Sequence, residues 1–347
     1  MSAIDWKDPK RTDVFHFVMV DPNNLDASYG DIEGVQLAST TLTYGYYTDT
    51  RYASRITFLK GNNYVRNAWI RIIHEVPSKG YVNELGTFIP VSPSVSYSGA
   101  TTETLDLQSP LWGLSNHYCT NSFTFAKGQS YKGAFQLICN RCDRPYLLNN
   151  PNDFITQSAI VYDAGTSFLD ILFDLSGSAN NRIDLDGHGR ITLSPLVNFQ
   201  YMSPSWDIDA DDPRSIVIQG SVKMETLSDE IPNRIIVMCG GYVGYADLPD
   251  GAEFSAAQRG YIKAQTYSAS GLKNNDQCTS LAQAYISQYV KVNQWGLQTM
   301  YFPAKCGETV RFTLNGVKHL CMIQAIDPIN LDTMTMQLTL REVESNG

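Results

Sequence analysis

The amino-acid sequence predicts a mainly β protein in which a small α+β middle domain lies between two β-barrel-like units. Three observations support this fold class. Val, Thr, Tyr, Ile and Phe dominate the patterned stretches, which is typical of β-sheet. Strand patterns separated by turn residues fill both ends of the chain, and helical patterns are few. At 347 residues the chain also exceeds one ordinary core, so two or three domains are expected.

Residues 1–108 are predicted to form the first β-barrel-like domain. Turn clusters such as the one around Pro22, and Gly61-Asn62, separate its extended segments. A series of short strands without a convincing helix indicates a sandwich or barrel. Residues from about 196 to 222 are candidates to complete this first barrel. The strand candidates within the first hundred residues are 13–20, 35–47, 54–60, 68–76 and 85–97.

Residues 109–195 are predicted to form the α+β middle domain. In 129–141 the apolar residues repeat at i, i+3, i+4, i+7 and i+8, which predicts one helical stripe. That stripe consists of Tyr131, Ala134, Phe135, Ile138 and Cys139. A second helix is predicted around Phe168–Leu175, with Asp163 or Thr166 as its N-cap and Gly177 just past its end.

The stretch NRIDLDGHGRITLSP (181–195) predicts a β-hairpin whose turn uses Asp186-Gly187. It is also similar to the first part of a calcium-binding loop. A loop that starts at Asp184 would place Pro195 at position 12, where a bidentate Glu is required. We therefore expect a plain hairpin here and no bound calcium.

Residues 223–347 are predicted to form the second β-barrel-like domain with one helix. The helix is expected over 276–292, with Asp276 as its N-cap, because apolar residues keep helical spacing over three turns. Residues 244–275 are polar and Gly-rich, which predicts a long loop. The strand candidates in this part are 216–226, 233–243, 296–302, 307–314, 317–328 and 333–343.

The charge balance argues against tight nucleic-acid binding. The chain has 26 Lys and Arg against 35 Asp and Glu, a net charge of −9, and no basic cluster. The opening MSAIDWKDPKRTDVF lacks the apolar core of a secretory signal, and the longest apolar runs are too short to span a membrane. Seven cysteines, an odd number, indicate synthesis in a reducing compartment.

His117, Cys119, Cys139 and Cys142 form an H-x-C…C-x-x-C array that raises the question of a zinc site. Cys139, however, lies on the predicted apolar stripe of helix 129–141, where a free cysteine packs like a small hydrophobe. A redox pair would need its cysteines at a helix N-terminus, and these lie at the C-terminal end. The sequence favours packing and leaves a structural zinc site open.

No catalytic constellation is recognisable in the sequence. It has no H-E-x-x-H, no G-x-S-x-G and no phosphate-binding loop, and in the predicted strand 68–76 His74 and Glu75 point to opposite faces. The Tyr-rich stretch 44–52 could serve as a sugar-binding platform, although tyrosine in alternating strands more often lies half-buried at a rim. We expect no catalytic residue, no cofactor and no metal ligand.

The order of these features resembles that of bacteriophage tail hub proteins. The segment IDWKDPKRTDVFHFVMVDPNNLDASYGDIEGVQLASTTLTYGYYTDTRYASRITF is similar to the first barrel of that family. AGTSFLDILFDLSGSANNRIDLDGHGRITLSP resembles its central helix, break and hairpin, and EIPNRIIVMCG resembles the strand that opens its second barrel. The helix 276–292 and GETVRF would complete that barrel. The resemblance covers nearly the whole chain.

The resemblance implies two tube-type β-barrels per chain and a trimeric ring of six barrels. Such a ring would join the tail tube or a distal tail protein to a central spike, fibre or receptor-binding protein. DNA would only pass through its channel, and an acidic lumen would let it slide. The implied location is the virion tail, after synthesis in the host bacterial cytoplasm.

Two other functions remain open. A receptor- or carbohydrate-binding tail module would use the Tyr-rich strands and bind host envelope. A wall-degrading tail enzyme would turn over peptidoglycan or surface polysaccharide.

Overall fold

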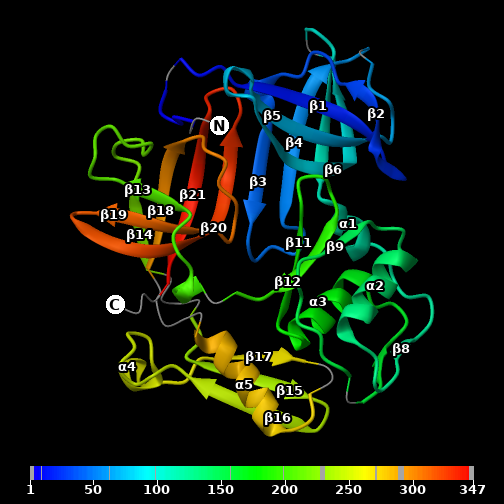
Figure 1. Cartoon of the computed structure of the whole chain (residues 1–347), viewed down its shortest axis with the longest axis vertical. Coiled ribbons are helices and arrows are strands. Elements are labelled where there is room, and N and C mark those ends of the chain that lie inside the picture. Colours follow the sequence, from blue (N-terminus) through cyan, green and yellow to red (C-terminus); the bar gives the residue numbers. More distant parts are fainter. Residues whose placement is uncertain are drawn as a thin grey trace.

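The computed structural model of the chain describes residues 4–343 except 9, 62, 98, 157, 198, 227–230, 270–271 and 288–292 (Figure 1). The prediction of a mainly β chain with a helix-containing middle domain is confirmed. Figure 1 shows two β-rich units side by side, with the middle domain below the N-terminal one and a smaller α/β unit below the C-terminal one.

The N-terminal β-unit is a run of antiparallel strands in the order β3-β4-β7-β6-β5-β1-β2. In β4 buried residues alternate with more exposed ones, as a strand with one core-facing side requires. The Pro-interrupted segment predicted as extended is the long strand β6. The strands are β1 (Val14–Asp21), β2 (Asn24–Asp31), β3 (Thr41–Gly45), β4 (Tyr52–Leu59), β5 (Trp69–Val76), β6 (Tyr81–Ser96) and β7 (Thr102–Gln108).

The C-terminal β-unit continues the same sheet, because β20 pairs antiparallel with β3. One hydrophobic core therefore runs through both units, from Phe88 in the first to Phe312 in the second. Its strands are β13 (Trp206–Asp209), β14 (Lys223–Thr226), β18 (Asn293–Met300), β19 (Thr309–Leu314), β20 (Val317–Asn330) and β21 (Thr335–Glu342).

Residues 196–222 were expected as candidates to complete the first barrel, and the structure corrects this expectation. Strand β13 pairs in parallel with β19, and Val217 bridges to Thr299, so the strand pairing of this segment is with the C-terminal β-unit. Parallel pairing between strands about a hundred residues apart leaves no local pattern in the sequence, which explains the misassignment.

The middle domain has a hydrophobic core of its own. The predicted stripe of helix α2 is confirmed, since all five of its residues are buried. The elements are α1 (Pro110–Ser115), β8 (Phe123–Phe125), α2 (Tyr131–Arg141), β9 (Tyr146–Leu148), β10 (Ile160–Tyr162), α3 (Phe168–Ser178), β11 (Asn181–Leu185) and β12 (Ile191–Pro195). The short 3-10 turns η1, η2 and η3 are Leu37–Ser39, Pro77–Lys79 and Phe199–Tyr201.

Helix α3 confirms the second predicted helix, but its ends differ. The N-cap is Ser167, whose Oγ accepts a hydrogen bond from the Asp170 amide, in place of Asp163 or Thr166. Gly177 lies inside the last turn, and Ala179 is the C-cap. The predicted hairpin is confirmed as the antiparallel pair β11 and β12.

Residues 231–286 contain a small α/β unit that the sequence did not predict. Strand β15 pairs with β16 on one side and in parallel with β17 on the other, and α5 packs on one face of this sheet. The elements are β15 (Arg234–Cys239), β16 (Tyr242–Asp247), α4 (Ala256–Arg259), β17 (Ala264–Ser268) and α5 (Asn275–Ile286).

Two expectations are therefore corrected. Helix α5 does not complete the second barrel, because its buried residues join the core of this separate sheet. Residues 244–275 are not one long loop, because β16 ends and β17 lies within them. The N-cap of α5 is Asn274, not Asp276, and the predicted end of the helix at 287–292 lies largely outside the described residues.

Candidate functional site

The four candidate zinc ligands lie in the middle domain, in the roles of packing residues. Cys119, Cys139 and Cys142 are buried, and burial raises the pKa of Cys139 to about 12 and that of Cys142 to about 11. His117 is exposed and packs edge-on against Phe168, with ring centroids 4.8 Å apart. Within the described residues no three His, Cys, Asp or Glu side chains are grouped to hold a metal ion.

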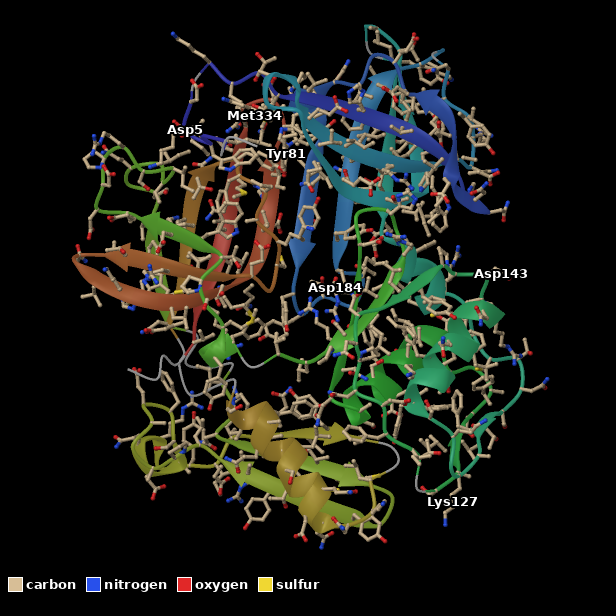
Figure 2. All side chains as sticks on the ribbon, viewed as in Figure 1. Asp5, Tyr81, Lys127, Asp143, Asp184 and Met334 are labelled. Atoms are coloured by element: carbon tan, nitrogen blue, oxygen red, sulfur yellow. The ribbon has the colours of Figure 1, made fainter. Side chains whose placement is uncertain are left out.

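The aspartates of the β11–β12 hairpin are engaged by arginines. Arg182 Nη2 donates to Asp184 Oδ2 at 2.7 Å, and Arg190 Nε donates to Asp186 Oδ2 at 2.7 Å. Both carboxylates therefore serve as ion-pair partners that stabilise the hairpin. Figure 2 places Asp184 near the centre of the molecule, where the middle domain meets both β-units.

The turn of this hairpin packs closely against the N-terminal β-unit. A Cβ on Gly187 would lie 2.3 Å from the carbonyl oxygen of Glu84 in β6, so only glycine fits. Thr87 Oγ1 donates to the Gly187 carbonyl at 2.9 Å. Arg71 Nη2 donates to the His188 carbonyl at 3.3 Å. The hairpin thus anchors the middle domain to β5 and β6.

Polar and charged side chains also contact each other across this junction. His188 lies between two carboxylates of the N-terminal β-unit, with Nε2 2.9 Å from Asp26 Oδ1 and Nδ1 3.2 Å from Glu84 Oε1. Arg71 lies 3.7 Å from Glu84, and burial lowers the pKa of Arg71. The contact therefore combines a steric fit with a charge network.

A second anchor lies at the base of the hairpin. Arg51, in the loop between β3 and β4, donates from Nε and Nη2 to the Ile183 carbonyl at 3.1 and 2.9 Å. Its Nη1 donates to the carbonyls of Tyr46 and Thr48 at 2.5 and 3.0 Å. Burial and the nearby positive charge of Arg182 lower the pKa of Arg51 to about 10. The hairpin is thus held to the N-terminal β-unit at Ile183 of β11 as well as at its turn.

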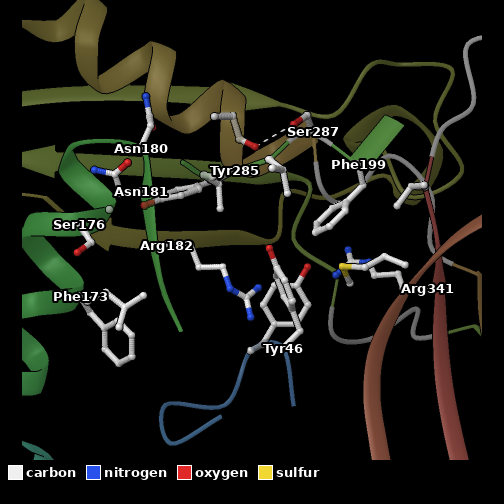
Figure 3. A pocket seen from close by; sticks show the side chains of 18 of the residues that line it. Tyr46, Phe173, Ser176, Asn180, Asn181, Arg182, Phe199, Tyr285, Ser287 and Arg341 are labelled. Atoms are coloured by element: carbon white, nitrogen blue, oxygen red, sulfur yellow. Dashed lines mark hydrogen bonds between the residues drawn. The ribbon is translucent and has the colours of Figure 1, made fainter. Parts of the chain in front are cut away.

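Next to this anchor lies a cavity of about 680 Å³ that all four units line (Figure 3). The N-terminal β-unit contributes Tyr46, the middle domain Arg182, the small α/β unit Tyr285 and the C-terminal β-unit Arg341. The Arg182 guanidinium stacks on the Tyr46 ring, 3.3 Å from its centroid. In Figure 3 Arg182 and Arg341 lie on either side of Tyr46. Sequence patterns did not indicate this cavity, because its wall joins residues far apart in the chain.

The Tyr-rich stretch 44–52 supplies this junction and the core. Tyr46 and Tyr52 are buried, and Tyr44 donates from its hydroxyl to the Leu85 carbonyl at 2.7 Å. Tyr47 is the exposed tyrosine of the stretch. A flat sugar platform needs several exposed rings, so this stretch lacks the geometry of one.

The structure also forms a buried His–Asp pair that the sequence did not indicate. His74 Nε2 lies 2.6 Å from Asp13 Oδ1, and the side chain of His74 is fully buried. Its ring packs edge-on against Tyr301 of the C-terminal β-unit at 4.9 Å. Burial lowers the pKa of His74. As predicted, Glu75 points away from this side, since it is half-buried and faces His16.

Comparisons with known proteins identify the fold. No family model and no curated protein sequence matches the chain. The structure of a tail protein from Neisseria meningitidis is similar, with a TM-score of 0.68 at 12% identity, over 95% of this chain and 96% of that chain. A prophage MuSo2 tail protein from Shewanella oneidensis has a TM-score of 0.66 at 10% identity, over 94% and 98% of the two chains.

A third similar structure comes from a secretion apparatus. It is an Escherichia coli component of the type VI secretion system, described as similar to the T4 bacteriophage tail proteins gp27 and gp5. Its TM-score is 0.55 at 9% identity, over 90% of this chain and 76% of that chain. The fold of the chain is therefore that of phage tail and tail-like proteins, as the sequence resemblance implied. No helix among the described residues is long and apolar enough to cross a membrane.

Proposed function

We propose that this chain is the structural hub of a phage tail tip or baseplate, or of a phage-derived injection device. The observation that carries the proposal is the shared fold with tail proteins over more than nine-tenths of this chain. A match of this extent leaves no large part of the chain to form a separate catalytic domain of another fold. The function we infer is therefore assembly and not turnover.

In this proposal three chains form a closed ring. Each chain contributes two β-units that already share one continuous sheet through the β3–β20 pair, so three chains supply six β-units. Closed cyclic symmetry is the common outcome for identical soluble subunits. Such a ring fits between a sixfold tail tube and a threefold spike or fibre and leaves a channel for the genome.

The partners we propose are further copies of the chain, the tail tube or a distal tail protein, and a central spike, fibre or receptor-binding protein. The net charge of −9 suits a channel wall that DNA passes without sticking, because phosphate meets like charge. We place the protein in the virion tail, after its synthesis in the host bacterial cytoplasm.

Oligomeric state and shape test the proposal directly. The purified full chain is analysed by light scattering after gel filtration and by negative-stain imaging, alone and with purified tube protein. We expect a particle with three times the mass of one chain, either alone or on the tube, and a threefold ring with a central hole. A chain that stays monomeric in both settings would refute the hub. Binding to host envelope would support the receptor-binding alternative, and turnover of peptidoglycan the enzyme alternative.

A further inference from the structure

The sheet of the small α/β unit has one covered and one uncovered face. Helix α5 packs on the covered face, where Tyr267 and Tyr285 also line the cavity that the four units share. That side therefore faces the rest of the chain, and the opposite face points away from it. Along β15 the buried residues, which face α5, are Ile235, Val237 and Cys239, and the residues between them face outward.

The outward face carries an apolar patch. Met238 of β15 lies directly opposite Val243 of β16, and Ile236 lies opposite Tyr245. Met238 is 42% exposed, Val243 49% and Tyr245 56%, which shows that no other described element covers them. Strand β17 adds only small side chains to this face, namely those of Ala264, Thr266 and Ser268. We call Ile236, Met238, Val243 and Tyr245 the outer patch.

The charges next to the outer patch neutralise each other. Arg234 and Asp247 lie opposite each other on β15 and β16, and Arg234 donates from Nε and Nη2 to the two carboxylate oxygens of Asp247 at 2.6 and 2.8 Å. The same guanidinium lies over the Tyr245 ring, 4.8 Å from its centroid. The outward face therefore offers no net charge for an ionic ligand, whereas methionine, tyrosine and arginine are enriched in protein–protein interfaces.

The net charge of the small α/β unit differs from that of the whole chain. Residues 231–286 have four basic and four acidic side chains, so the net charge of −9 resides in the remainder. The basic residues are Arg234, Arg259, Lys263 and Lys273, and the acidic ones are Asp247, Asp250, Glu253 and Asp276. Two copies of an acidic chain repel each other over most of their surface. A neutral unit with an apolar face is therefore the part that a second copy can approach most closely.

The small α/β unit is attached at an open end of the large sheet. It is inserted between β14 and β18, and β14 pairs with β18 alone among the described strands. The other end of the same sheet is β2, and Figure 1 shows β2 and β14 on opposite sides of the molecule. Copies that meet head to tail in a closed ring use two different surfaces of each chain. The unit therefore lies on a side where the next copy of such a ring can be placed.

The size of the outer patch fits a contact within a larger assembly. Its exposed side chains offer about 300 Å² of apolar surface, whereas each partner in a stable protein complex buries about 800 Å². The outer patch alone would thus not hold a dimer together. It fits a neighbour that other contacts already hold in place, which in a ring is another copy of the chain.

We propose that the outer patch is the contact of the small α/β unit with the neighbouring copy in the ring. This inference rests on the proposed hub function and adds to it a surface through which one copy meets the next. The apolar side chains of the outer patch become buried on assembly, and the Arg234–Asp247 pair lies at the rim of the contact.

Thiol labelling reports directly whether the outer patch becomes buried. Val243→Cys places a thiol in it, and Val161→Cys is the control on β10 of the middle domain. Val161 is 58% exposed and Val243 49%, so the two thiols should react at similar rates in a free chain. In the trimer, formed alone or on tube protein, we expect the thiol at 243 to react at least about tenfold more slowly than the thiol at 161, as mass mapping would show. Equal rates in the trimer would overturn the proposal.

A double substitution that keeps the net charge tests whether the outer patch helps to hold the copies together. Met238→Lys with Val243→Glu replaces two apolar side chains by an opposite-charge pair directly across β15 and β16, so the strands should stay paired and the melting temperature of the free chain should be close to that of the wild type. Val161→Lys with Thr124→Glu makes the same pair across β10 and β8 and is the matched control. Light scattering should show a trimer association constant at least about tenfold lower in the first variant and unchanged in the second.

The outcomes separate this proposal from that of the hub. A wild-type trimer together with equal association of the Met238→Lys, Val243→Glu variant, or with equal weakening in the control, would overturn the outer patch as the contact and leave the hub standing. A wild-type chain that is monomeric alone and on the tube would refute the hub and this contact with it. If the thiol at 243 reacts freely in the trimer and is protected only after purified spike or fibre protein is added, the occupant is that partner, and contact with a second copy is excluded.

Discussion

Replacement of Gly187 by alanine should loosen the middle domain from the N-terminal β-unit. The new Cβ would lie 2.3 Å from the Glu84 carbonyl oxygen, about 1 Å short of ordinary contact, so the hairpin turn must move by about that distance. A shift of this size stretches the hydrogen bond from Thr87 to Gly187 and that from Arg71 to His188 beyond bonding distance. Together with the overpacking, these losses amount to about 2–4 kcal/mol.

The assay for Gly187→Ala combines calorimetry with amide hydrogen exchange. We expect the unfolding transition that includes the middle domain to move down by about 5 °C or more, and exchange to rise in β11, β12 and the facing part of β6. Gly133→Ala is the matched control, since a Cβ there meets only ordinary contacts at 3.5 Å in helix α2 and should be neutral or slightly stabilising. A Gly187→Ala protein with wild-type melting and exchange would refute this account of the junction.

Three further changes test other parts of the structure. Burial lowers the pKa of His74 below its usual 6.5. The stability that the neutral, buried His74 contributes is therefore present above pH ~6.5 and is lost as the pH falls below that value. The difference between the urea midpoints at pH 7.5 and pH 5.5 should be smaller in His74→Gln than in the wild type, and an identical difference would contradict this. Cys139 is fully buried with its pKa raised to about 12, so its thiol should not react with a thiol reagent at pH 8 until the protein unfolds, as mass mapping of the labelled cysteine would show. Gly244→Ala would place a Cβ 2.1 Å from the Thr279 amide nitrogen, so it should displace α5 and lower the stability of the small α/β unit by about 1–3 kcal/mol. Faster amide hydrogen exchange in β15 would show this loss of stability. Unchanged exchange in β15 would exclude such tight packing.

Local patterns in the sequence predicted the elements that depend on interactions between nearby residues. The stripe of α2 and the Asp-Gly turn of the β11–β12 hairpin depend on neighbours a few residues apart, and both were predicted correctly. Cap positions were less certain, because Asp163, Thr166 and Ser167 can all accept the required hydrogen bond. In the structure the Oγ of Ser167 accepts the hydrogen bond from the Asp170 amide, so Ser167 is the cap.

Elements that depend on contacts between residues far apart in the chain could not be predicted in the same way. The parallel pair of β15 and β17 joins segments with a polar and Gly-rich stretch between them, and β17 itself is mostly exposed. The apolar face of helix α5 is recognisable in the sequence, but such a face can pack equally well on a barrel or on a small sheet. The cavity at the junction of the four units is lined by residues far apart in the chain, such as Tyr46, Tyr285 and Arg341, so no local pattern in the sequence indicates it.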